Sequence, residues 1–435
     1  MKVLFSVIII VSIAINSYAQ KSTNHVVDQT IPSVYSGIQS NEIGDLYFIS
    51  IKTSDTSWMK NKTTFYTLSN IRTCPVGTEK GLLFDFKNKE FYGTLDFGLY
   101  PTNKSKYPQP VFFKYSSRII KGVAEIDISA LKGKYDVAGW ETLGKARIGY
   151  RISDNYGKII YDGSVNIIGK SPFTLDASIV AGPYINMITS NSVVITYETN
   201  RITDTYIEVD GKKYFDSTLP KNKLNNEILI NNLQPNTNYD YTVSYGTNTL
   251  TYSFQTAPSV GSRSPFTFAY TSDSRAGNGG GERNIYGVNA YIMKRMAVLA
   301  SSQNARFFQF TGDMINGYSS NIGETKLEYA NWKKAVEPYW HYIPFNVGAG
   351  NHEALVNSFD DNSTYAITID KFPFNTSSAE TIFSNNFVHP GNGPLSEDGA
   401  YYDPHNNKPD FPEYGETVYY YLYGNVAIVV LNSNY

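Results

Sequence analysis

The sequence Tyr-Ile-Pro-Phe-Asn-Val-Gly-Ala-Gly-Asn-His-Glu, residues 342–353, starts as a short apolar strand and ends in a turn that carries polar side chains. Two earlier segments follow the same plan: residues 266–275 end in Ser-Asp-Ser-Arg, and residues 306–313 end in Thr-Gly-Asp. Residues 284–302 and 324–340, which lie between these segments, carry apolar side chains at helical spacing. This alternation of strands and helices predicts a largely parallel sheet covered by helices.

The polar residues at the strand ends form the candidate functional site. The carboxyl ends of strands in open α/β sheets face the crevice where ligands bind, so we expect these residues to converge. They are Asp273, Asp313, Asn351 and His352. Two carboxylates and an amide are hard oxygen ligands, which together with histidine suit Mg, Mn, Fe or Zn. A pair of such ions polarises a phosphoryl group, and a neighbouring histidine protonates the leaving oxygen.

The chain ahead of residue 261 has the pattern of β structure in two parts. Residues 20–172 alternate apolar and polar side chains and hold no catalytic constellation, which predicts an all-β accessory domain of open role. Residues 173–260 resemble a fibronectin type III sandwich. Tyr239 stands at the start of a predicted strand, where its side chain is expected to fold back onto the preceding turn as a tyrosine corner. We therefore expect two β-sandwich-like domains, followed by an α/β domain over residues 261–435.

Residues 1–19 have the layout of a secretory signal peptide, with Lys2, an apolar run, and small residues ahead of a cut after Ala19. No later apolar run approaches 18 residues, so we expect an exported protein, secreted or periplasmic, without a transmembrane segment. The formal net charge of −2 argues against a nucleic-acid-binding protein. A single cysteine, Cys74, excludes an intrachain disulfide and a cysteine-based zinc cluster. The oligomeric state stays open.

From about residue 266 the chain resembles the calcineurin-like metallophosphoesterases, and the fibronectin-like domain ahead of it resembles the arrangement in purple acid phosphatases. The Gly-Asn-His-Glu motif is the most specific point of this resemblance. It implies that Asp273 binds the first of two metal ions, that Asp313 bridges both, and that Asn351 binds the second. It also implies that His352 contacts the phosphate and assists the leaving group. The expected activity is hydrolysis of phosphate monoesters or diesters.

Two positions depart from the family pattern close to this site. Arg275 stands where many members have a metal-binding histidine, and a guanidinium group does not ligate a cation. Arg275 either binds a phosphate oxygen of the substrate or forms a structural salt bridge. Asn316 occupies the position of the iron-binding tyrosine of purple acid phosphatases, and Tyr318 lies two residues further along. Mn, Zn and Mg are therefore as plausible as Fe.

A third departure concerns the histidines that complete the family's metal site. After His352 only His389 and His405 remain, and we expect both in a long polar loop, residues 354–416, near substrate or solvent. The chain then stops after what resembles the next strand of the sheet. We therefore expect a metallophosphoesterase domain that is incomplete at its C-terminus. The alternative is a non-catalytic extracellular binding protein with a degenerate phosphatase-like domain.

Overall fold

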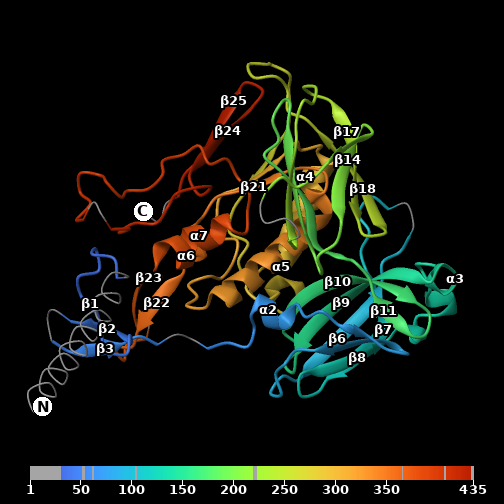
Figure 1. Ribbon diagram of the computed structural model, residues 1–435, viewed down its shortest axis with the longest axis horizontal. Helices are drawn as coiled ribbons and strands as arrows, with labels where there is room; N and C mark the ends of the chain where they lie inside the picture. The colour runs from blue at the N-terminus through green and yellow to red at the C-terminus, as the bar shows by residue number, and fades with distance from the viewer. Residues whose placement is uncertain are drawn as a thin grey trace, which may run out of the picture.

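The computed structural model describes the chain from residue 31 onward with short gaps, and it is mainly β structure (Figure 1). The described ranges are 31–50, 54–60, 63–102, 105–218, 223–364, 366–405 and 408–432. The signal peptide predicted at residues 1–19 lies outside them. No helix within these ranges is long and apolar enough to cross a membrane.

Two antiparallel sheets form an N-terminal sandwich, at the lower right of Figure 1. One sheet has the strand order β11-β10-β9-β6-β7, and the other has the order β4-β5-β8. Phe84, Leu95 and Ile152 from these strands are fully buried in one apolar core. The strands are β4 (Val76–Gly77), β5 (Gly81–Asp85), β6 (Gly93–Leu99), β7 (Val111–Ile119), β8 (Val123–Asp127), β9 (Lys145–Asp154), β10 (Ile159–Gly169) and β11 (Phe173–Leu175).

A second sandwich follows, with the sheets β12-β13-β16 and β15-β14-β17-β18. Its strands are β12 (Ile179–Asn186), β13 (Val193–Thr199), β14 (Thr205–Val209), β15 (Lys212–Tyr214), β16 (Asn225–Ile230), β17 (Asn238–Tyr245) and β18 (Asn248–Gln255). The Tyr239 hydroxyl accepts a hydrogen bond from the backbone nitrogen of Gln234 (2.8 Å). The tyrosine corner predicted from the sequence is therefore confirmed.

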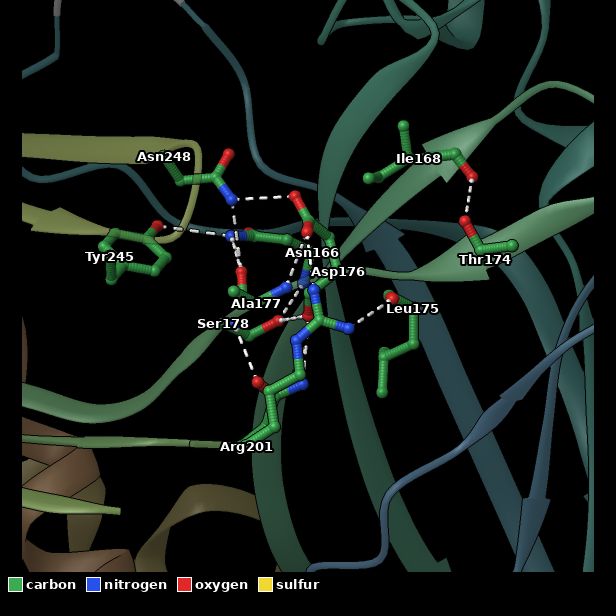
Figure 2. Close-up of polar contacts among 11 residues, drawn as sticks. Asn166, Ile168, Thr174, Leu175, Asp176, Ala177, Ser178, Arg201, Tyr245 and Asn248 are labelled. Atoms are coloured by element: carbon green, nitrogen blue, oxygen red, sulfur yellow. Dashed lines mark hydrogen bonds and ion pairs between the residues drawn. The ribbon is translucent and has the colours of Figure 1, made fainter. Parts of the chain in front are cut away.

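A polar network joins the two sandwiches (Figure 2). The Asp176 carboxylate pairs with Arg201 (3.0 Å) and accepts from the side-chain amide of Asn248 (2.7 Å). Asn166 of β10 donates to the hydroxyl of Tyr245 in β17 (3.2 Å). Because Asp176 is buried, these partners satisfy a carboxylate that would otherwise be costly to remove from water.

The strand and helix alternation expected after residue 261 is present. Strands β19 (Ala269–Thr271), β20 (Phe308–Phe310) and β21 (Phe345–Val347) pair in parallel in that order, and their last residues are in register. Helices α4 (Ala290–Ser302) and α5 (Ile322–Trp340) pack on this sheet through buried side chains that include Met293 and Trp332. Helix α4 starts later than expected because the Asn289 side chain caps it by accepting from Ile292 N (3.1 Å).

The expectation of one long polar loop over residues 354–416 was wrong. That stretch contains the hairpin β22 (Val356–Phe359) and β23 (Ile367–Asp370) and the short helices α6 (Phe374–Ser377) and α7 (Ala379–Ser384). Strands β1 (Ile38–Ser40), β2 (Leu46–Ile49) and β3 (Thr56–Trp58) lie beside the β22–β23 hairpin (Figure 1). Ile38 and Phe359 share a small core there, and contacts of this kind between distant segments leave no local pattern in the sequence.

The expected next strand of the parallel sheet also differs. Strands β24 (Tyr419–Tyr423) and β25 (Val426–Val430) pair only with each other among the described residues, as a separate antiparallel hairpin. The Tyr419 hydroxyl donates to the carbonyl oxygen of Val347 in β21 (2.8 Å). A side chain, instead of a strand backbone, therefore satisfies this group at the edge of β21.

Candidate functional site

The loops that follow β19, β20 and β21 meet at the carboxyl edge of the sheet. The backbone nitrogen of Asp273 donates to Gly312 O (3.1 Å), and the backbone nitrogen of His352 donates to Asp313 Oδ1 (3.1 Å). Asp273 and Asp313 both have left-handed backbone conformations, with φ of 63° and 57°. Aspartate tolerates this conformation better than most residues, so each loop turns sharply as it leaves its strand. The structure thus brings the three predicted loops together.

Glycine makes the close approach of these loops possible. A Cβ on Gly350 would lie 2.5 Å from Asp313 Oδ1 and 2.6 Å from Asp313 N. A Cβ on Gly312 would overlap the backbone of Gly350, and one on Gly317 would overlap the carbonyl oxygen of His352. Any larger residue at these positions would therefore push the second and third loops apart.

Glu353 ties the second and third loops together and is fully buried. Its carboxylate accepts from the backbone nitrogens of Gly350 (2.6 Å), Asp313 (2.9 Å) and Met314 (2.8 Å). Burial raises the pKa of Glu353 to about 7, the negative charge of Asp313 adds to the rise, and the three N–H donors oppose it. In the sequence this residue stands out only as the end of the Gly-Asn-His-Glu motif, because spacing does not distinguish a buried carboxylate from an exposed one.

His352 and Arg275 lie side by side at the surface of this edge. His352 Nδ1 lies 2.6 Å from the carbonyl oxygen of Asn316, and a carbonyl only accepts, so we assign the ring proton to Nδ1. Nε2 then accepts from Arg275 Nη1, which is in direct contact with it. Arg275 is exposed and His352 is half-buried. These two contacts fix the orientation of the histidine ring, with Nε2 facing the Arg275 guanidinium group.

Tyr318 is a further residue of the site, and its contacts could not be read from the sequence. The side-chain amide of Asn351 donates to the Tyr318 hydroxyl (2.7 Å), which turns the amide oxygen of Asn351 to the other side. The Tyr318 ring also packs edge-on against the His352 ring, with 5.0 Å between centroids. Tyr318 therefore contacts both residues of the third loop.

The oxygen donors at this edge fit a hard cation. Asp273 and Asn351 are exposed, and Asp313 is 9% exposed, so three loops present two carboxylates and an amide. Across the described ranges, no group of three or more His, Cys, Asp or Glu side chains is placed to hold a metal ion. Asp273, Asp313 and Asn351 thus lie on the three loops that meet at this edge, and their binding of metal ions stays a prediction.

The expectation for His389 was wrong, whereas His405 is exposed as expected. His389 is buried, and its ring stacks on Tyr419 with 4.5 Å between centroids. Its Nε2 accepts from the backbone nitrogen of Val347 (3.2 Å), and burial lowers the pKa of the imidazole to about 3. His389 is therefore a neutral structural partner at the edge of β21.

No known protein family and no curated protein sequence matches the chain. Among solved structures, PhoD overlaps 57% of this chain and 51% of its own, at 17% identity and a TM-score of 0.35. The purple acid phosphatase PPD1 from yellow lupin (Lupinus luteus) seeds overlaps 80% of this chain and 62% of its own, at 13% identity and a TM-score of 0.39. The central fibronectin-III array of RIM-binding protein overlaps 47% of this chain and 76% of its own, at 15% identity and a TM-score of 0.22. The chain thus spans less than two thirds of PhoD and of the lupin phosphatase, and TM-scores this low decide neither fold nor function.

Proposed function

We propose that this chain is an exported, metal-dependent phosphoesterase that hydrolyses phosphate monoesters or diesters. It would consist of a signal peptide (1–19), an all-β domain (20–172), a fibronectin-like domain (173–260) and a metallophosphoesterase domain (261–435). The observation that carries the proposal is the Arg275–His352 contact beside the oxygen donors of three strand-end loops.

Each residue of the site has a role in this proposal. Asp273, Asp313 and Asn351 would hold two metal ions (Mn, Zn, Mg or Fe), with Asp313 shared between them. Bound ions would supply Lewis-acid polarisation of the phosphoryl group. Arg275 would donate to a phosphate oxygen, since its planar fork matches phosphate geometry.

His352 would protonate the leaving oxygen from Nε2. In the structure Nε2 accepts from Arg275, so this nitrogen lacks the proton that a general acid needs. A substrate phosphate would draw the Arg275 guanidinium to itself and leave Nε2 able to take up a proton. Because Asn316 O already fixes Nδ1, the ring would keep its orientation during this exchange.

The test is hydrolysis of 4-nitrophenyl phosphate and bis(4-nitrophenyl) phosphate by the exported chain supplied with Mn²⁺, Zn²⁺, Mg²⁺ or Fe. His352→Gln should lower kcat by about 100-fold or more, the usual contribution of a general acid. Arg275→Gln should mainly raise KM. The exposed Asp240→Asn in the second sandwich is the matched control and should leave both values unchanged. No metal binding and no hydrolysis by the wild type would overturn the proposal in favour of the non-catalytic binding protein.

A further inference from the structure

A cavity of about 460 Å³ lies where the two sandwiches meet helices α4 and α5. Its walls come from all three parts, including Arg147 of β9, Tyr252 of β18 and Ala290 of α4. None of the five residues proposed for phosphate chemistry lines it. Small-molecule sites occur preferentially at such junctions between domains, and this volume lies in their usual range.

Arg147 is the cation in this cavity whose contact with a carboxylate is the longest, and it shares that carboxylate with Lys334. Its Nε and Nη2 donate to the Ser164 hydroxyl (3.1 and 2.8 Å), and its guanidinium lies 4.3 Å above the Tyr100 ring. The nearest carboxylate oxygen in the described residues belongs to Glu337 and is 3.9 Å away, beyond hydrogen-bond distance. That carboxylate already accepts from Lys334 (2.6 Å). Arg147 therefore keeps N–H donors that donate to no carboxylate among the described residues, and its charge is only partly balanced by the shared Glu337.

The other charges of the cavity compensate one another. Arg151 binds both carboxylate oxygens of Asp162 (2.7 and 2.6 Å), and Lys294 pairs with Glu282 (2.8 Å). Over the described lining residues, four cationic side chains face three carboxylates, so one positive charge is left over. That excess lies at Arg147, the cation with no carboxylate in hydrogen-bond distance.

Aromatic rings supply much of the remaining wall. Tyr100, Phe112, Tyr252 and Tyr339 line the cavity. Flat rings pack favourably against such side chains, and a single excess positive charge matches a monoanion better than a phosphate dianion. We propose that this cavity binds a small aromatic carboxylate, with Arg147 as the group that anchors its carboxylate.

The probe is 2-naphthoate, with the uncharged 2-naphthamide as a ligand of the same shape, and binding is measured by calorimetric titration of the full exported chain. The wild type should bind naphthoate with a dissociation constant below about 1 mM and the amide about tenfold more weakly. Arg147→Gln should lower naphthoate affinity about tenfold, to the level of the amide. The matched control Arg118→Gln, an exposed arginine on β7 of the same sheet, should bind as the wild type does.

Two more variants separate the cavity from folding defects and from the proposed phosphate site. Val298 lines the cavity and is half exposed, so Val298→Trp should narrow the entrance without disturbing the core, and should weaken naphthoate binding. Asp313→Asn should abolish phosphatase activity and leave naphthoate binding intact. Absence of saturable naphthoate binding to the wild type, equal binding of the amide, or full binding by a folded Arg147→Gln would each overturn the proposal.

Discussion

The substitution Gly350→Ala tests whether the candidate site depends on direct contact between the second and third loops. Gly350 has φ of −103° and ψ of −178°, a conformation open to any residue, so the only obstacle to a side chain is space. An added Cβ would lie 2.5 Å from Asp313 Oδ1, and real Cβ atoms essentially never come closer than 3.0 Å to another heavy atom. The loops would therefore have to separate by at least about half an ångström.

The cost of this separation follows from what holds the loops. Asp313 Oδ1 accepts from His352 N, and Glu353 accepts from Asp313 N and Met314 N, so the shift strains three hydrogen bonds between the loops as well as the packing. Overpacking of this kind costs about 1–3 kcal/mol. At about 2–4 °C per kcal/mol for a domain of 150–250 residues, the melting temperature should fall by roughly 2–12 °C.

Thermal unfolding, monitored by circular dichroism, measures the stability of the variant. Mn²⁺ titration of the same samples measures the metal affinity of the proposed site, to which Asp313 and Asn351 both contribute. The control is Gly391→Ala, because a Cβ there would meet no atom within 4 Å. We expect Gly350→Ala to lower both the melting temperature and the Mn²⁺ affinity, with the control unchanged. A Gly350→Ala protein that melts and binds Mn²⁺ as the wild type does would refute the close approach of the two loops.

Three further substitutions test other parts of the site and fold. Tyr318→Phe should weaken Mn²⁺ binding about 2- to 10-fold, because the side-chain amide of Asn351 loses the hydroxyl that orients it. The control Tyr401→Phe changes a fully exposed ring and should leave Mn²⁺ binding unchanged. Equal Mn²⁺ affinities of the two variants would contradict a role of Tyr318 in orienting Asn351. Glu353→Ala should lose at least about 3 kcal/mol in urea unfolding because three backbone N–H groups lose their acceptor, and Glu353→Gln should lose less. Burial raises the pKa of Glu380 from 4.5 to about 7, so its ionisation lowers stability as pH rises through that window. Glu380→Gln should therefore stabilise the protein by about 3 kcal/mol at pH 8 and not at pH 4.5, and equal urea midpoint shifts at both pH values would contradict the shifted pKa.

Local sequence patterns predicted the parts of this protein that depend on neighbouring residues. The apolar runs that become β19, β20 and β21 and the helical spacing of α4 and α5 are periodic, so the parallel sheet followed from them. The residue types at the strand ends predicted which loops converge. The corner of Tyr239 was equally readable, because its hydrogen bond reaches back only five residues to Gln234.

Tertiary structure alone decided the contacts that join distant residues. The sequence could not show that Arg275 contacts His352, that Tyr318 receives the amide of Asn351, or that His389 is buried. It also gave no sign that residues 354–416 pack on strands near the N-terminus. Side-chain identity determines which chemistry a residue can perform, and local periodicity indicates which face of a helix or strand it occupies. Which groups become partners, and which are buried away from water, depends on how segments tens to hundreds of residues apart pack together.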